Sequence, residues 1–319
     1  MKKNLFTLLA AFIGFTSFGQ STGQITSILA DDITQGEQII EAYFTPMAES
    51  FGASLNNGWY NTAKPHSLGG FDLTFTLNTV IIPNTAKAFN IKEAGGDVFT
   101  STEDEAATIF GSSNTTEMIY DIGAGVNNPK FDMPGGFKTP ALPLPMMQAG
   151  IGLIKKTAID VRFMPMMNVG KNINVNLFGI GLKHDLLQWI PVVGDAIPMS
   201  LSIQGGYTTL NTELKIADQK VALKTKATTI NLVASRKILM VTGYAGVGYN
   251  SSKTTFSADA NFDLGGVKFE EEVAMDFTSN NNLRANIGLR LNITLLTIQA
   301  DYTFAEYPTA TLGLGVSLR

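Results

Sequence analysis

Residues 283–293 read LRANIGLRLNI, and they alternate apolar and polar side chains over the whole stretch. The alternation continues in LTIQADYTF at 296–304 and in TLGLGVSLR at 311–319. A period of two residues is the signature of a β-strand whose two faces meet different environments. Strands of about ten residues, apolar on one face and polar on the other, are typical of a transmembrane β-barrel.

The composition indicates an exported protein. Residues 1–19 combine two lysines, an apolar stretch and, in Ser17-Phe18-Gly19, small residues at the spacing that signal peptidase reads, which predicts a cleaved signal peptide. The chain has no cysteine, so we expect neither disulfides nor thiolate metal sites. A formal net charge of −4 gives no reason to expect nucleic-acid binding. Only 16% of the residues are charged, which fits a barrel with apolar residues at alternate positions.

Helical spacing precedes the strands. Residues 25–51 repeat apolar side chains at three- and four-residue steps, as an amphipathic helix does. Pro46 interrupts this pattern, which predicts a kink or two shorter helices. A turn-rich stretch follows at 56–61, and the first strand is expected from Leu68 onward.

We therefore expect an all-β fold, a transmembrane antiparallel β-barrel of about 10–14 strands with a short N-terminal helical plug. The expected parts are the signal peptide at 1–19, a helical hatch or plug at 20–66, and the barrel at 67–319. Two stretches without a sustained period, at about 83–145 and 259–281, are expected as long outer loops. Tight turns near 155–156, 235–237 and 293–295 are assigned to the opposite rim.

A soluble secreted β-sandwich is the alternative, because its strands also alternate. Sandwich strands usually have about five or six residues, which is shorter than the strands expected here. The polar face of this chain is also rich in Asn, Thr, Gly and Arg, whereas Lys and Glu usually crowd a solvated face. The barrel therefore explains the pattern better.

Two groups of residues are candidate site residues. An apolar part of the first long loop would capture a ligand or fold over the barrel mouth. It comprises Phe131, Met133, Phe137, Leu142, Leu144, Met146 and Met147. Charged residues on the polar strand faces would point into the lumen, either as contacts to the plug and a salt-bridged filling or as a selectivity ring for an anionic solute. They are Asp160, Arg162, Arg284, Arg290, Asp301 and Arg319.

Evidence for metal binding or catalysis is weak. Asp259, Asn261, Asp263 and Glu270 have partly the spacing of a calcium loop, but the glycine is misplaced and β patterns flank the motif. A polar strand face running into a turn is the other interpretation. His66 is expected to be a solvated turn residue. The chain contains no nucleophile elbow, metalloprotease motif or phosphate loop, so we expect no enzyme and no cofactor.

The chain also resembles a known group of proteins. The helical segment 33–51, the stretch GWYNTAKPH at 58–66, LGGFD at 68–72, GLKHD at 181–185 and the closing strands carry the resemblance. They resemble an uncharacterised family of Gram-negative outer-membrane barrels, similar in layout to the long-chain fatty acid transporters, in which a helical hatch precedes the barrel. The resemblance implies an outer-membrane location and implies no ligand-contacting residue.

Two functions remain open from the sequence. The protein would passively take up a small hydrophobic molecule, captured by residues 131–147 and admitted by movement of the hatch. Alternatively, it would be a barrel with a filled lumen that anchors or contacts surface or secretion components. An outer-membrane hydrolase is a weaker third hypothesis. Expected partners are outer-membrane lipid, a small apolar ligand and the outer-membrane insertion machinery, although the chain ends in Leu318-Arg319 rather than in an aromatic residue.

Overall fold

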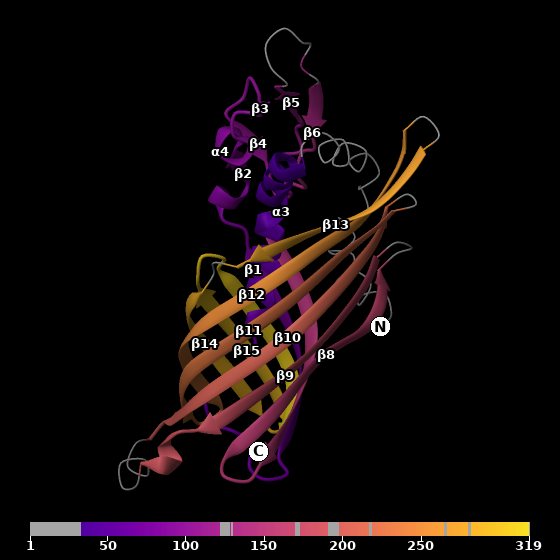
Figure 1. Cartoon of the computed structure of the whole chain (residues 1–319). Coiled ribbons are helices and arrows are strands. Elements are labelled where there is room, and N and C mark those ends of the chain that lie inside the picture. Colours follow the sequence, from indigo (N-terminus) through magenta and orange to yellow (C-terminus); the bar gives the residue numbers. More distant parts are fainter. Residues whose placement is uncertain are drawn as a thin grey trace.

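The chain folds into one closed antiparallel β-barrel of ten strands (Figure 1). This computed structural model describes residues 33–121, 128, 130–169, 173–190, 198–216, 219–264, 267–279 and 282–318; the expected signal peptide and Arg319 lie outside them. In chain order the barrel strands are β1 (Phe71–Ile81), β7 (Ala141–Leu153), β8 (Thr157–Val169), β9 (Ile173–Asp185), β10 (Ser200–Ile216), β11 (Gln219–Ile238), β12 (Val241–Leu264), β14 (Leu283–Ile293), β15 (Leu296–Phe304) and β16 (Thr309–Leu318). Strand β16 pairs with β1 and closes the ring, so the expected barrel is confirmed.

Strand β13 (Val267–Thr278) lengthens the wall without adding to the ring. It pairs with the later part of β12, from Lys253 to Leu264, whereas β14 pairs with the earlier part, from Val241 to Tyr249. The two strands are thus successive partners of one long strand. The outer loop expected at 259–281 is therefore largely a β-hairpin, because the described residues of this stretch continue β12 and form β13.

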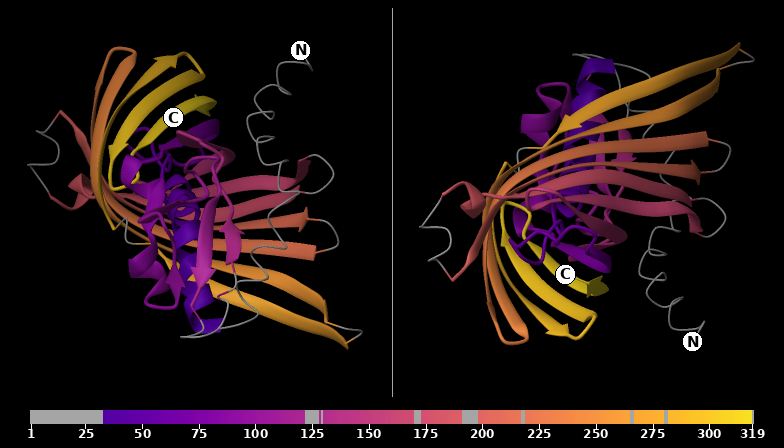
Figure 2. Two further views of the ribbon diagram at one scale, coloured as in Figure 1. Left: turned by 90° about the horizontal axis from the view of Figure 1, so that it is seen from above. Right: turned by 90° about the horizontal axis from the view of Figure 1, so that it is seen from below.

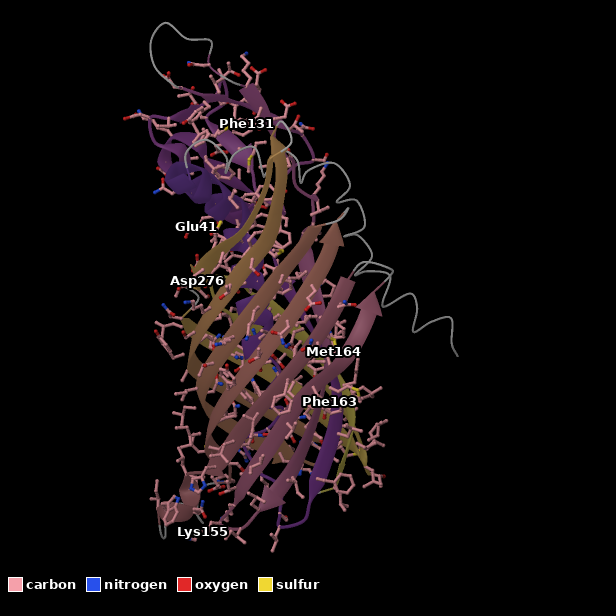
Figure 3. All side chains as sticks on the ribbon, turned by 45° about the vertical axis from the view of Figure 1, so that its right-hand side comes forward. Glu41, Phe131, Lys155, Phe163, Met164 and Asp276 are labelled. Carbon is pink, nitrogen blue, oxygen red and sulfur yellow. The ribbon has the colours of Figure 1, made fainter. Side chains whose placement is uncertain are left out.

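The two ends of the barrel differ in the lengths of the strands that reach them. Lys155 marks one end and Phe131 the other (Figure 3). We call the Lys155 end inner and the Phe131 end outer, because outer-membrane barrels keep short turns on the periplasmic side. Strands β10, β11 and β12 have 17, 20 and 24 residues, against 11, 9 and 10 in β14, β15 and β16.

The expected contrast in turn length is only partly correct. Three outer hairpins, after β8, β10 and β12, are as short as the inner ones. The inner connection between β9 and β10 is longer than these three outer hairpins and contains the 3₁₀ helix η3 (Leu187–Trp189). The rims therefore differ in strand length and in one large outer insertion rather than in all their loops.

An apolar belt surrounds the inner part of the barrel. Along β15 the outward side chains carry no charge over the nine residues from Leu296 to Phe304, whereas on β11 Lys224 and Lys226 are exposed further out. Nine residues match the strand length that crosses a bilayer. The belt contains exposed large apolar side chains from all around the ring, among them Phe75, Ile151, Phe178, Ile180, Leu182, Ile203, Tyr207, Leu232, Val247, Tyr249, Ile287, Leu289, Ile298, Leu312 and Leu314. Such a belt is stable only in contact with lipid.

Where the belt ends, the apolar side chains change from the outward face of the strand to the inward face. In β9 the outward residues within the belt are Phe178, Ile180 and Leu182, but further out Val175 and Leu177 point inward and are buried. The expectation that the apolar residues face lipid is therefore wrong for the outer part of this strand. There the barrel stands beyond the membrane and buries its apolar residues against an internal helix.

That helix is α3 (Ile33–Asn56), which enters the barrel from the outer end (Figure 2). It is one helix with Pro46 inside it, rather than two shorter helices. Every residue from Pro46 to Asn56 is buried. Residues 57–66, which we call the bridge, continue through the inner half of the lumen, and the chain then turns into β1. We call α3 and the bridge together the plug. Within the described residues, no helix is long and apolar enough to cross a membrane.

The described residues of 82–140, which are 82–121, 128 and 130–140, form a small cap on the outer end of α3 (Figure 1). The cap contains η2 (Asn84–Ala86), β2 (Ala88–Asn90), α4 (Ile91–Gly95), β3 (Phe99–Thr100), β4 (Glu105–Ala107), β5 (Thr116–Tyr120) and β6 (Lys130–Met133). Strand β2 pairs with β4, and β3, β5 and β6 form a three-stranded sheet. The outer loop expected at 83–145 therefore ends earlier, because 141–145 belong to β7.

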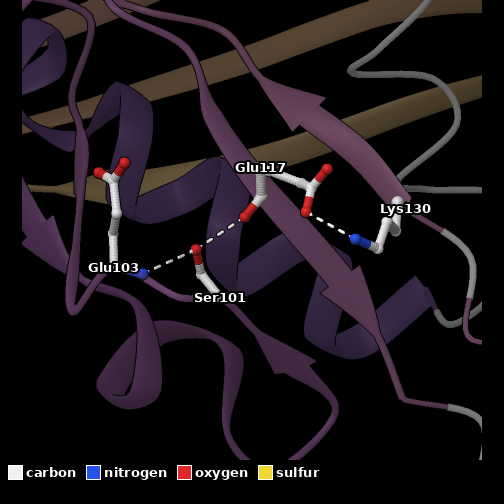
Figure 4. A network of polar contacts seen from close by, with 4 residues as sticks. All are labelled: Ser101, Glu103, Glu117 and Lys130. Carbon is white, nitrogen blue, oxygen red and sulfur yellow. Dashed lines mark hydrogen bonds and ion pairs between the residues drawn. The ribbon is translucent and has the colours of Figure 1, made fainter.

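Polar contacts fasten the surface of the cap (Figure 4). The Ser101 hydroxyl donates to the backbone carbonyl of Glu117 at 2.7 Å and accepts from the Glu103 amide at 3.2 Å. Lys130 pairs with the Glu117 carboxylate at 2.8 Å, across the β5–β6 pair. Both partners are about half exposed, so this ion pair adds little stability and orients the hairpin.

An apolar core joins the cap, α3 and the outer strands. Phe44 of α3 packs against Phe256 of β12, with ring centroids 5.1 Å apart. Burial raises the pKa of the Tyr43 phenol, which therefore stays neutral and donates to the Gly135 carbonyl at 3.1 Å. The cap, α3 and the outer strands thus share an apolar core like that of a soluble domain.

Candidate functional site: the sealed lumen

The inner half of the lumen is polar, and its buried arginines donate hydrogen bonds to the plug. Arg162 on β8 is fully buried; its guanidinium donates to the Leu55 carbonyl at 2.9 Å and to the Gln148 side chain at 3.1 Å. The same group lies 3.9 Å from the centroid of the Trp59 ring. Arg162 thus binds a carbonyl in the last turn of α3, where the helix dipole is negative.

Arg284 makes the equivalent contact from β14. Its guanidinium donates to the Asn56 carbonyl at 2.6 Å and to the Thr303 hydroxyl at 3.3 Å. Strands β8 and β14 are five positions apart in the ring of ten, so the two arginines reach α3 from opposite walls. The end of the helix is therefore held across the whole width of the lumen.

The bridge is held further inward by side-chain hydrogen bonds. Arg290 donates to the Asn61 side chain at 2.9 Å, and the Tyr60 hydroxyl donates to Asn286 at 2.7 Å. The hydroxyls of Thr62 and Ser235 are 3.1 Å apart. Polar groups buried in a lumen are stable only when they are satisfied, so these bonds fix the path of the bridge.

Glycines in the wall make room for the bridge. A Cβ atom on Gly206 would lie 2.4 Å from the Trp59 ring, and one on Gly181 would lie 2.7 Å from it. A Cβ on Gly246 would lie 2.3 Å from the Tyr60 hydroxyl. The barrel wall is therefore shaped to the two aromatic side chains of the bridge.

The inner end of the bridge is also buried. His66 Nε2 lies 3.2 Å from an Asp72 carboxylate oxygen, and only 3% of His66 is exposed. The expectation of a solvated turn histidine is therefore wrong, because the bridge keeps the imidazole inside the barrel until the chain turns into β1.

The predicted lumen charges lie where the alternation places them. Asp160, Arg162, Arg284, Arg290 and Asp301 are all buried on the inner face, and Asp301 accepts a hydrogen bond from the Tyr244 hydroxyl at 2.8 Å. Arg319 lies outside the described residues. The hydrogen bonds described above join the three arginines to the plug. The role of the lumen charges in the function of the protein stays a prediction.

The predicted loop residues do not form one exposed patch. Met133 is buried, and Phe131 and Phe137 pack against the core beneath the cap. Leu142, Leu144, Met146 and Met147 lie in β7 rather than in a loop, the first three on its inner face and Met147 on its outer face. Their role in binding a ligand stays a prediction.

The calcium candidate lies on the β12–β13 hairpin. Asn261 pairs with Glu270 across the two strands. The side chains of Asp259, Asn261, Asp263 and Glu270 lie outside the described part of the structure. Where side chains are described, no three acidic or histidine residues gather so as to hold a metal ion.

Sequence reasoning missed the residues of the bridge that contact the wall. Trp59, Tyr60 and Asn61 fall in the turn-rich stretch 56–61, which has no periodic pattern. A usable signal was the pair of large aromatic residues within a polar stretch, because such residues are rarely left in solvent.

The apolar belt, the closed ring and the polar, occupied lumen define the class of this protein: it is an outer-membrane β-barrel with an internal plug. The chain belongs to a family of unknown function, DUF6588, whose model matches residues 1–318. No curated protein sequence matches it.

The chain is also similar to solved structures at low sequence identity. One is Ail, the attachment invasion locus protein of Yersinia pestis, at 10% identity and a TM-score of 0.28, covering 78% of this chain and 97% of that one. Another is the translocator domain of the autotransporter NalP from Neisseria meningitidis, at 9% identity and 0.30, covering 89% and 97%. A third is the toluene transporter TodX of Pseudomonas putida, at 10% identity and 0.26, covering 77% and 68%.

Proposed function

We propose that this protein is a sealed outer-membrane barrel that anchors an outward-facing module. The module consists of the cap, the outer half of α3 and the outer parts of β10–β13. The observation that carries the proposal is the grip of Arg162, Arg284 and Arg290 on the plug at the level of the membrane. A conducting barrel needs an open lumen at this level.

Displacement of the plug from the lumen requires a large free energy. Each of the three arginines would lose a charge-assisted hydrogen bond, a contact worth about 1.5–3 kcal/mol. Trp59 would also leave a pocket shaped by two glycines and the stacked Arg162 guanidinium. Spontaneous opening is therefore rare, and the module gains a rigid attachment to the barrel.

Passive uptake of a small hydrophobic molecule is the second candidate. It is supported by the buried apolar cluster, which continues from Met118 and Met133 in the cap to Leu144, Leu177 and Leu210 on the lumen-facing side of the outer barrel wall. In this hypothesis residues 131–147 receive the molecule and the plug moves to release it. Uptake requires movement of the plug, whereas anchoring does not.

A disulfide lock separates the two functions. Thr62 on the bridge and Ser235 on β11 have hydroxyls 3.1 Å apart, and the chain has no cysteine of its own. The double variant Thr62→Cys/Ser235→Cys would tether the plug to the wall in an oxidising compartment. Thr225→Cys/Thr254→Cys is the control, because these hydroxyls, 2.9 Å apart, join two neighbouring wall strands, and a disulfide between them would not tether the plug to the wall.

The readouts are conductance in planar bilayers and uptake of 1-N-phenylnaphthylamine by cells with an intact lipopolysaccharide leaflet. We expect wild type, lock and control to conduct equally little, and cells expressing each to take up the probe no faster than cells without the protein. Faster uptake with wild type, abolished by the lock and restored by a reductant, would establish the hatch and reject the anchor.

A further inference from the structure

Among the residues that the structure describes at the inner rim, the exposed charges have one sign. The β7–β8 turn exposes Lys155 and Lys156, and the β11–β12 hairpin exposes Arg236 and Lys237. Lys64 of the bridge is exposed beside this hairpin, since the neighbouring Ala63 amide donates to the Ser235 hydroxyl at 2.9 Å. Among the described residues of the two turns, no acidic side chain is exposed to balance Lys155, Lys156, Arg236 and Lys237.

Apolar side chains extend to the tips of the same turns. Leu239 is 89% exposed and Met240 58% exposed at the tip of the β11–β12 hairpin, and Ile154 is 68% exposed beside the two lysines. Trp189 is 61% exposed on η3, in the connection that lies between these two hairpins along the sheet. Aromatic and apolar residues at such positions mark the boundary between hydrocarbon and headgroups.

The cations therefore lie at the level of the phospholipid headgroups rather than out in the periplasm. Long basic side chains keep their stems on apolar surface and their charges at the interface. Three successive inner connections, from β7 to β12, carry the cationic and apolar residues along one continuous arc of the rim.

We propose that this arc binds the phosphate headgroups of anionic phospholipids in the inner leaflet of the outer membrane. The ligating residues are Lys155, Lys156, Arg236 and Lys237, with Lys64 close by. Charge complementarity and continuity with the apolar belt identify a membrane lipid as the occupant, because an acidic soluble partner would not account for a nearly fully exposed leucine at the tip. Lipid binding at this rim does not depend on whether the plug moves, so this inference is independent of the proposed function.

The test is native mass spectrometry of the full chain in mild detergent, titrated in parallel with phosphatidylglycerol and phosphatidylcholine. We expect wild type to retain phosphatidylglycerol at least about fivefold better. The variant Lys155→Gln/Lys156→Gln/Arg236→Gln/Lys237→Gln should retain the two lipids equally. Either pair of substitutions alone should reduce the preference, which keeps the test valid should the fourfold variant fold poorly.

The matched control replaces four exposed lysines at the outer end, Lys92, Lys138, Lys224 and Lys226, with glutamine. This variant should keep the wild-type preference. Equal retention of both lipids by wild type, or an unchanged preference in the fourfold inner variant, would overturn the proposal. So would binding of wild type to purified peptidoglycan that the inner substitutions abolish without any lipid preference, because it would assign the arc to the cell wall.

Discussion

Adding one methyl group to the barrel wall should unseat the plug. In the variant Gly206→Ala the new Cβ would lie 2.4 Å from a Trp59 ring carbon. Carbon atoms pack at about 3.5 Å, so the ring must retreat by about 1 Å. The ring is 1% exposed and has the Arg162 guanidinium 3.9 Å from its centroid, so it cannot retreat without disturbing that contact.

The expected cost follows from these contacts. Overpacking of this kind lowers the free energy of unfolding by about 1–3 kcal/mol. Alanine also restricts the unfolded chain more than glycine does, which raises the free energy of unfolding by about 0.4–1 kcal/mol. Gly206→Ala should therefore lower the free energy of unfolding by about 1–2 kcal/mol. The neighbouring Gly205→Ala is the control, since the nearest atom to its Cβ would be a Thr229 carbonyl oxygen at 3.9 Å. That variant should be neutral or slightly stabilising.

Tryptophan fluorescence is the natural assay, because the chain contains two tryptophans and Trp189 is the exposed one. In a Trp189→Phe background, Trp59 alone reports on the seating of the plug. We expect Gly206→Ala to shift its emission to longer wavelength and to increase quenching by acrylamide, while the barrel keeps its strand content by circular dichroism. Identical emission and denaturation midpoints in the two glycine variants would refute the fit between wall and plug.

Three further outcomes are expected. Arg162→Ala should lower the free energy of unfolding by about 3 kcal/mol, since it leaves buried carbonyl groups without a donor; Arg162→Lys should restore only part of it, and a full restoration in chemical denaturation would contradict the two-pronged contact. Tyr60→Phe should cost about 1 kcal/mol through loss of its bond to Asn286, measured as a lower denaturation midpoint. Gln38→Cys in α3 should react with a membrane-impermeant maleimide on intact cells, whereas Lys156→Cys should react only after the outer membrane is opened; the reverse pattern would invert the assigned orientation.

The closing strands were predictable because their outward faces lie within the belt. The expected stretches 283–293 and 296–304 coincide with β14 and β15. The cap was not predictable in detail, since its strands have two to five residues and are too short to show a period. Alternation also cannot say which face is inward when the surroundings change along one strand, as they do in β9.

The lumen shows the same division. A period of two residues was enough to place Arg162, Arg284 and Arg290 on the inner face. It could not identify their partners, because Leu55, Asn56 and Asn61 reach them through the path of the plug and not through any local pattern. The pattern of a strand thus predicts which of its own residues face the lumen, but it does not predict which residues of the plug contact them.

In β9 the apolar side chains change from the outward face to the inward face where the belt ends, and this change determines how deep the protein sits in the bilayer. Just outside the belt, Asn176 accepts a hydrogen bond from Asn211 of β10 at 3.0 Å, and just inside it Phe178 is exposed to lipid. A displacement of two residues along the strand, about 7 Å, would drag this amide pair into hydrocarbon in one direction and lift Phe178 into water in the other. Immersion depth is therefore encoded in the chain, and a membrane of different thickness would have to adjust its lipids to the protein.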